Sequence, residues 1–228
     1  MPLDAMAHSH KKFKEEYGKK YIQLFKDLAE KGQAPKTLFI SCSDSRVVPN
    51  LITYTKPGDL FVTRNIGNFI PPYDPERDNC ATAAVIEYAL VHLNVETIIV
   101  CGHTHCGACE ALYHEIPDSD EELNLRRWMR YGEEAKEQAL ALIGDGDKDD
   151  LLRATEKFNV IDQLTHLLSY PAVKKRVHNH ELHVMGWYYH VHSGNLEYFN
   201  PLEYRFVPVE DLKKPARKSK KKKEKSTE

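Results

Sequence analysis

Hydrophobic positions along the chain follow two spacings, one typical of helices and one typical of buried strands. Apolar residues recur every three to four positions over 10–31, which predicts an amphipathic helix that ends before Gly32 and Pro35. Three short apolar runs predict strands, and they lie at 37–40, 60–63 and 97–101. The last run is apolar at nearly every position, as expected for a parallel strand that is buried on both faces.

Segments with a helical period fill most of the remaining chain, and we expect helices at 79–93, 107–114, 120–142 and 148–168. A late apolar run at 181–189 predicts another strand, and the turn residues 193–195 lead to a hairpin partner at 196–199. This alternation predicts an α/β fold: a mainly parallel central sheet flanked by helices, with an antiparallel hairpin or edge strand at its C-terminal end. Ligands of such sheets bind at the carboxyl ends of the strands.

The composition is that of a globular protein. The chain has 228 residues, 41% hydrophobic and 29% charged, which excludes wholesale disorder or a fibrous repeat and suits a single domain. No apolar run approaches the roughly 18 residues that a membrane span requires. The first residues lack the apolar region of a secretion signal, so we expect a cytoplasmic protein with reduced thiols.

Charge separates the end of the chain from the rest. Residues 213–228 contain nine Lys or Arg and two Glu, a net +7, so residues 1–212 carry −9 of the total of −2. A self-repelling run of this kind predicts a disordered tail, which either only aids solubility or binds anionic surfaces. The acidic remainder argues against a specific nucleic-acid partner. We therefore divide the chain into an N-terminal helical arm at 1–34, an α/β domain at 35–212 and the tail.

The five cysteines differ in their predicted positions. An odd number without a secretion signal makes a disulfide framework improbable. Cys80 falls inside a predicted helix and Cys101 inside a buried strand, so we interpret both as small core residues. Cys42, Cys106 and Cys109 lie at element ends, where a thiolate could face a cavity.

The densest set of potential metal ligands surrounds the end of the third predicted strand. Zinc prefers thiolate and imidazole ligands, and a catalytic zinc site uses three protein ligands and one open position. His103 and Cys106 are three residues apart at a strand-to-helix turn, and Cys42 at a neighbouring strand end could supply the third ligand.

Two other classes of function compete with a catalytic zinc site. Cys106-Gly-Ala-Cys109 resembles the active site of a thiol–disulfide oxidoreductase, with its first thiol at a helix N-terminus. That alternative leaves the segment from Cys42 to Arg46 unexplained. A zinc-stabilised binding module that uses the basic tail is the other alternative.

Three motifs, in this order, resemble those of β-class carbonic anhydrases: Cys42-Ser-Asp-Ser-Arg46, Arg64-Asn-Ile-Gly-Asn68 and Cys101-Gly-His-Thr-His-Cys106. The resemblance implies one zinc per subunit, held by Cys42, His103 and Cys106. It implies reversible hydration of carbon dioxide to bicarbonate and a proton by zinc-bound hydroxide. It also implies an obligate homodimer, or a larger assembly such as a tetramer, with active sites at the subunit interface and the N-terminal arm packed across the partner subunit.

Other residues receive roles on the same resemblance. Two thiolates leave zinc without net charge, so Asp44 is expected to orient the attacking oxygen while Arg46 holds Asp44 in a bidentate pair. A carbon dioxide pocket should be apolar with one polar handle. Its expected residues are Gln33 (the amide donor), Phe61, Ile66 and Tyr88, and His92 is a candidate proton shuttle.

Two residues point to the plant-type, open-site branch of the family. In the other branch the counterpart of Asp44 binds zinc, and a Trp stands three residues before the first zinc-binding Cys. This chain has Phe39 at that position and Gln33 where the open branch has it. We therefore expect an Asp44–Arg46 pair and a fourth zinc position open to water.

Overall fold

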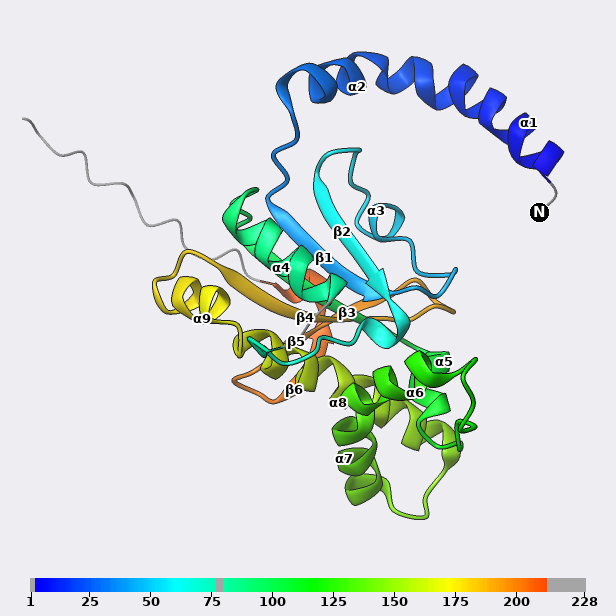
Figure 1. The fold of residues 1–228 in the computed structure, drawn as a ribbon, viewed down its shortest axis with the longest axis vertical. Coiled ribbons are helices and arrows are strands. Elements are labelled where there is room, and N and C mark those ends of the chain that lie inside the picture. The colour runs from blue at the N-terminus through cyan, green and yellow to red at the C-terminus, as the bar shows by residue number, and fades with distance from the viewer. Residues whose placement is uncertain (1–2, 77–79, 213–228) are drawn as a thin grey trace, which may run out of the picture.

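The N-terminal arm is one helical rod that extends away from the rest of the molecule. In a computed structural model, which describes residues 3–76 and 80–212, α1 (Leu3–Phe13), a π-helical turn (Lys14–Gly18) and α2 (Lys19–Lys31) follow one another without a break (Figure 1). The rod begins at Leu3 rather than at residue 10, because its first turns are helical without an apolar period. No residue of these three elements is buried.

The six strands found among the described residues form one sheet. Their order is β2-β1-β3-β4-β5-β6. The first four strands are parallel and the last two pair in antiparallel fashion, which confirms the predicted fold class. The strands are β1 (Thr37–Cys42), β2 (Leu60–Asn65), β3 (Thr97–His103), β4 (His183–Tyr189), β5 (Leu196–Asn200) and β6 (Arg205–Pro208).

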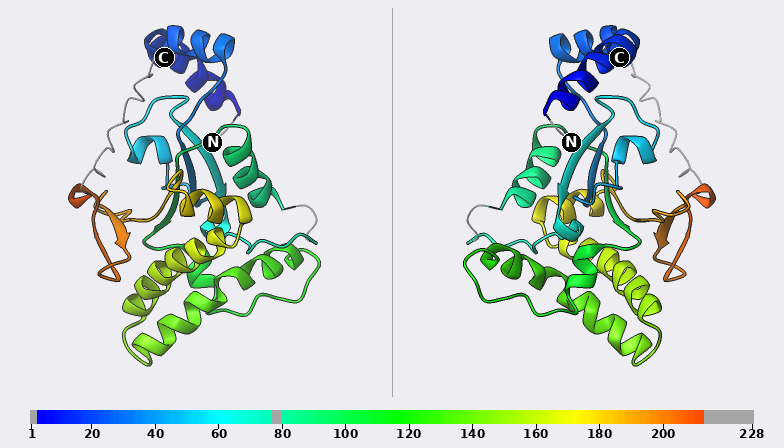
Figure 2. Two further views of the ribbon diagram at one scale, coloured as in Figure 1. Left: turned by 90° about the vertical axis from the view of Figure 1, so that its left-hand side faces the viewer. Right: turned by 90° about the vertical axis from the view of Figure 1, so that its right-hand side faces the viewer.

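Helices cover the sheet and extend beyond its carboxyl edge. α4 (Ala81–Val91), α8 (Lys148–Leu168) and α9 (Pro171–His178) pack against one face and enclose the largest apolar core. The long α8 pairs with α7 (Glu133–Ile143) in a hairpin at the end of the molecule opposite the arm (Figure 2). The shorter helices are α3 (Pro49–Ile52), α5 (Gly107–Ala111) and α6 (Leu123–Met129).

Three local predictions were wrong. The single helix expected at 120–142 is divided into α6 and α7 by a 3-10 turn at 130–132. Cys80 is not a core residue inside a helix: its backbone is extended, and its half-buried thiol caps α4 by accepting a hydrogen bond from Ala83 N–H. Cys109 does not face a cavity from an element end, because it lies within α5 and is only 1% exposed. Cys101 is buried in β3 as predicted.

The lysine-rich tail lies outside the described residues. Among the residues that are described, no helix combines the length and the apolar character that crossing a membrane requires.

Candidate metal centre

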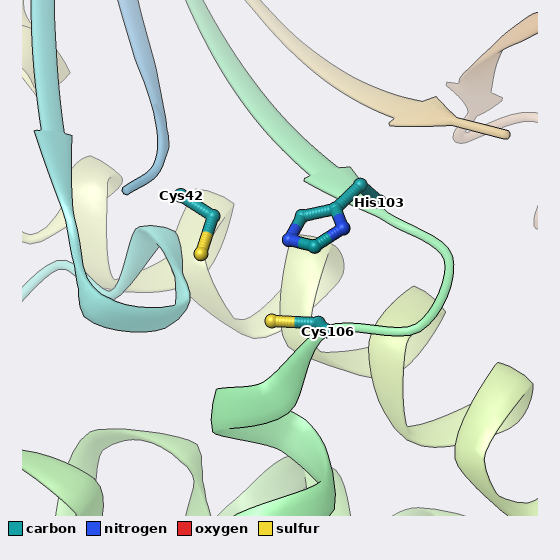
Figure 3. Close-up of side chains that lie close together, drawn as sticks. All are labelled: Cys42, His103 and Cys106. Carbon is teal, nitrogen blue, oxygen red and sulfur yellow. The ribbon is translucent and has the colours of Figure 1, made fainter. Parts of the chain in front are cut away.

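Three side chains from separate elements converge beyond the carboxyl edge of the sheet. Cys42 ends β1, His103 ends β3, and Cys106 precedes the first residue of α5. Their ligand atoms all lie within 4.8 Å of one another (Figure 3). All three residues are buried, with exposed fractions of 5% or less. The structure thus brings together the three residues that the spacing had suggested.

The sheet register explains this convergence. β1 and β3 are parallel neighbours, with Ser41 opposite Cys101, so both strands deliver their last residues to the same edge. Between the two ligands of the third motif, His103 and Cys106, His105 adopts a left-handed conformation at φ 57°. That residue reverses the chain direction, so that Cys106 faces back toward Cys42 (Figure 3).

The imidazole is prepared for a ligand. Nδ1 of His103 lies 2.9 Å from the carbonyl oxygen of Thr104, to which it donates, and this contact fixes the tautomer with its lone pair on Nε2. Nε2 is buried and has no hydrogen-bond partner among the described residues. An unsatisfied buried acceptor costs about 1–3 kcal/mol, which a bound cation would remove.

The two thiols also fit a cation. Their hydrogen bond and burial raise the pKa of Cys42 to about 12. A hydrogen bond with Cys109 raises the pKa of Cys106 well above its ordinary value. Thiols paired in this way are poor nucleophiles by themselves, whereas a metal would bind both as thiolates. Two sulfurs and one imidazole nitrogen make a donor set that suits zinc.

A paired carboxylate and guanidinium lie beside the ligands. Arg46 donates from Nε to Asp44 Oδ1 at 2.9 Å and from Nη2 to Oδ2 at 2.7 Å. This bidentate contact holds the pKa of Asp44 well below its usual range, so the carboxylate is ionised. Arg64 fixes the chain from Cys42 to Asp44 by donating to the carbonyl oxygens of Cys42 (3.0 Å) and Asp44 (2.5 Å).

Known proteins resemble this chain in sequence and in fold. A model of the carbonic anhydrase family matches residues 37–196. The carbonic anhydrase of Helicobacter pylori strain J99 is 39% identical over 204 residues, which make up 87% of this chain and 91% of that protein. The solved structure of the β-carbonic anhydrase CcaA matches with a TM-score of 0.84 at 37% identity, over 90% of this chain and 91% of that one. The chain belongs to the β-carbonic anhydrase family.

A further solved structure bears on assembly. One of two tetrameric β-carbonic anhydrases from Sordaria macrospora matches with a TM-score of 0.75 at 28% identity, over 86% of this chain and 98% of that one. Family membership confirms the enzyme class and zinc as the cofactor. The structure does not favour a thiol–disulfide oxidoreductase, because both Cys106 and Cys109 are buried and their exposed fractions are 2% or less.

A cavity of about 580 Å³ lies beside the ligands of this β-carbonic anhydrase. Ser43, the neighbour of Cys42, lines one wall, and Ile66 lines another. Trp128 of α6 also lines the cavity, and its Nε1 donates to the carbonyl oxygen of Ile66 at 2.8 Å. α6 therefore belongs to the surroundings of the site, a placement the sequence had not indicated.

The other expected substrate residues lie elsewhere in the same chain. Phe61 stands opposite Leu38, four positions before Cys42 on β1, or about 13 Å along a strand. Its ring packs against Tyr88 at 5.8 Å between centroids, and Tyr88 packs against His92 at 4.9 Å. Gln33 is exposed ahead of β1. A single chain does not bring these four residues to the metal ligands.

Sequence analysis missed a buried carboxylate in contact with the ligand loop. Glu156 of α8 is 1% exposed and accepts a hydrogen bond from Cys106 N–H at 2.9 Å. Burial raises its pKa, while hydrogen bonds from Tyr188, Cys106 and Arg153 act against that shift. A polar residue on the inward stripe of a long amphipathic helix was the available signal in the sequence.

Proposed function

We propose that Cys42, His103 and Cys106 hold the catalytic zinc with which this enzyme hydrates carbon dioxide reversibly to bicarbonate and a proton. The convergence of the three ligand atoms within 4.8 Å, with a buried unpartnered nitrogen on His103, carries this assignment. When bound there, zinc supplies a Lewis acid that lowers the pKa of water and makes it a nucleophile near neutral pH.

The residues around the metal prepare the attacking water. Asp44 is ionised and therefore only accepts hydrogen bonds, so it selects the water orientation whose lone pair points away from the carboxylate. Arg46 prevents the carboxylate from rotating, because it engages both oxygens and also donates to the carbonyl oxygen of His105 at 2.9 Å. Asp44 orients the water, and Arg46 acts indirectly, by holding Asp44 in place.

We assign the chain to the plant-type, open-site branch. Three observations support this. Both oxygens of Asp44 are occupied by Arg46 rather than directed to the ligand group. Phe39 is fully buried with its ring edge-on to Trp187, at 6.0 Å between centroids. A phenylalanine ring there has no N–H to donate, unlike the tryptophan of the closed branch.

We further propose that Gln33, Phe61 and Tyr88 complete the substrate pocket of a partner subunit, with Ile66 contributed by the subunit that binds the zinc. The separation of Phe61 from Cys42 within one chain supports this, as does the 46% exposed fraction of Tyr88. We propose that the N-terminal arm packs across that partner, because no residue of its helices is buried within its own chain. His92 would then serve as proton shuttle at the same interface. The tetrameric relatives agree with such an assembly.

A cytoplasmic location remains a prediction.

Zinc content and stopped-flow hydration of carbon dioxide, measured on the same preparations, test the ligand assignment. We expect Cys42→Ser, His103→Ala and Cys106→Ser each to lose zinc and activity together, because a three-ligand site deprived of one bond cannot hold the ion. Cys80→Ser is the matched control for zinc content, since Cys80 lies outside the ligand group and the variant should keep its zinc. Full zinc occupancy in the His103→Ala protein would overturn the assignment.

A further inference from the structure

The loop from His103 to Cys106 carries two of the three proposed zinc ligands, and β4 holds one side of it. Thr104 N–H donates to the carbonyl oxygen of Tyr189 at 2.9 Å. Thr104 Oγ1 accepts from Val191 N–H at 3.0 Å. These contacts fix the histidine end of the loop to the sheet but leave the peptide before Cys106 to be held from elsewhere.

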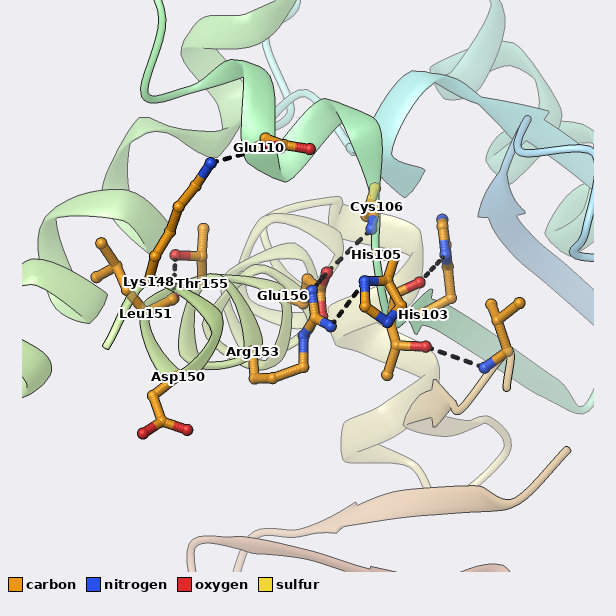
Figure 4. Close-up of polar contacts among 12 residues, drawn as sticks. His103, His105, Cys106, Glu110, Lys148, Asp150, Leu151, Arg153, Thr155 and Glu156 are labelled. Carbon is orange, nitrogen blue, oxygen red and sulfur yellow. Dashed lines mark hydrogen bonds and ion pairs between the residues drawn. The ribbon is translucent and has the colours of Figure 1, made fainter. Parts of the chain in front are cut away.

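The other side of the loop is held by the carboxylate of Glu156 (Figure 4). Oε1 accepts from Cys106 N–H at 2.9 Å and from Arg153 Nη2 at 2.7 Å. Oε2 accepts from the Tyr188 hydroxyl at 2.5 Å. The three donors come from the ligand loop, from α8 and from β4, so a single side chain ties these three elements together.

A charged group is an expensive means of satisfying one peptide N–H in the protein interior. Elsewhere on the inward face of α8, the neutral amides of Asn159 and Gln163 form the hydrogen bonds to buried backbone groups. Asn159 donates to the carbonyl oxygen of Gly67 at 3.0 Å, and Gln163 accepts from Ile70 N–H at 2.6 Å. On this helix Glu156 places a carboxylate on a backbone group that belongs to a proposed zinc ligand, and this points to a role in holding the ligand.

Arg153 extends the contact to the catalytic pair. Its Nη1 lies 3.2 Å from Nδ1 of His105, so the guanidinium donates to the ring (Figure 4). The carbonyl oxygen of His105 in turn accepts from Arg46, which holds Asp44. The loop residue between the two ligands is therefore held by arginines on both sides, one leading to Glu156 and one to Asp44.

We infer that Glu156 is a positioning residue for the metal site: it sets the position of the Cys106 sulfur through the Cys106 peptide, and Arg153 fixes Glu156 and His105 together. The inference rests on the proposed assignment of Cys106 as a zinc ligand. Groups in contact with metal ligands typically change metal affinity by about 10–100-fold when they are replaced. Glu156 and Arg153 act through the ligand loop and do not touch the substrate.

Zinc affinity of the full-length protein tests the inference, measured by competition with a chromophoric chelator. We expect Glu156→Gln to bind zinc about 10–100-fold more weakly, because the amide keeps the size of the side chain but not its charge. Asp162→Asn is the matched control: it removes another buried carboxylate from the same helix, one whose side chain bonds Gln138 instead of the loop. It should bind zinc as the unmodified protein does.

Cobalt substitution supplies a readout that a merely structural role would not change. The sulfur-to-cobalt charge-transfer bands should shift in Glu156→Gln and stay unchanged in Asp162→Asn. If Glu156→Gln fails to fold, Arg153→Met provides the same measurements, since its side chain is 26% exposed and it should loosen the carboxylate. Unchanged zinc affinity and unchanged bands in the folded variant would overturn the inference. Unweakened zinc binding by Cys106→Ser would instead overturn the ligand assignment.

Discussion

Asp44 illustrates how one neighbour sets the chemistry of a residue. A carboxylate near two buried thiols could bind the metal itself, but here Arg46 engages both of its oxygens and its own backbone N–H adds a third bond at 2.9 Å. The arginine side chain is 47% exposed and the aspartate side chain 16%. The pair therefore lies at the boundary between the buried ligands and solvent.

We expect Asp44→Asn to retain zinc but lose most of the hydration rate. The amide is close in size to the carboxylate, but it presents an N–H donor where the carboxylate only accepts, so it no longer imposes one water orientation. A loss of about 10²-fold or more is typical when such a group is removed. Zinc analysis and stopped-flow kinetics on the same sample measure both properties.

Two results would contradict the roles given to Asp44. A variant that hydrates carbon dioxide at the normal rate would remove its orienting role. A structure of the zinc-loaded protein near neutral pH, with an Asp44 oxygen about 2.0–2.2 Å from the metal, would contradict the open-site assignment instead.

At the scale of elements, α8 shows which features of a helix the sequence describes and which it does not. Its helical limits, 148–168, were predicted correctly, because apolar periodicity and the break before residue 148 are local signals. Two of its buried polar residues accept from backbone groups far away in the sequence: Glu156 from Cys106 N–H, 50 residues away, and Gln163 from Ile70 N–H, 93 residues away. No local pattern specifies such pairings, so the helix could be predicted and its support of the metal site could not.

The site itself was predictable in a different way. Cys42, His103 and Cys106 belong to motifs whose residue types already suit zinc, and parallel strands deliver their ends to one edge. The short strand β6 was missed, because Pro208 and its place at the edge of the sheet weaken the strand pattern. The positions of Phe61 and Tyr88 could not be inferred from the pattern, since both would also suit core aromatic residues.

Asp162 makes the packing of α7 against α8 sensitive to pH. Asp162 is 5% exposed, and burial raises the pKa of its carboxyl group from 3.8 to about 6. The negative charge of Glu134 raises this pKa further, whereas the hydrogen bond from Gln138 at 2.9 Å lowers it. The folded state therefore binds this proton more tightly than the unfolded state does. The stability that it contributes is complete below about pH 4 and is lost as the pH rises to about 6.

We expect Asp162→Asn to be more stable than the unmodified protein at pH 7 by about 1–2 kcal/mol, because the amide carries no buried charge. Urea unfolding of both zinc-loaded proteins from pH 4 to pH 8 measures the difference. It should increase between about pH 4 and pH 6 and then remain constant. A difference that does not depend on pH, or a less stable variant at pH 7, would show that the Asp162 carboxylate is not destabilising.

At the scale of the whole molecule, the residues proposed for metal and substrate lie in two separate regions of the chain. Its metal ligands lie at the carboxyl edge of the sheet, whereas Phe61 and Tyr88 pack together four strand positions away. The arm adds a helical rod from Leu3 to Lys31 in which no residue is buried. In the dimer that we propose, symmetric association of two copies would resolve both features at once, because each copy would give its aromatic pair to the other copy's metal site.

Subunit complementation tests this shared site. Cys42→Ser alone should be inactive for lack of zinc, and Tyr88→Ala alone should be strongly impaired for lack of a pocket wall. If the pocket is completed by the partner, each mixed dimer contains one intact site, built from the ligands of the Tyr88→Ala subunit and the aromatic wall of the Cys42→Ser subunit. Random assembly from equal amounts should then recover about a quarter of the unmodified activity. Co-refolded chains, checked for mixed dimers by mass spectrometry, would be assayed by stopped-flow hydration. Mixed dimers with no more activity than the two parents would show that Tyr88 serves the metal site of its own chain.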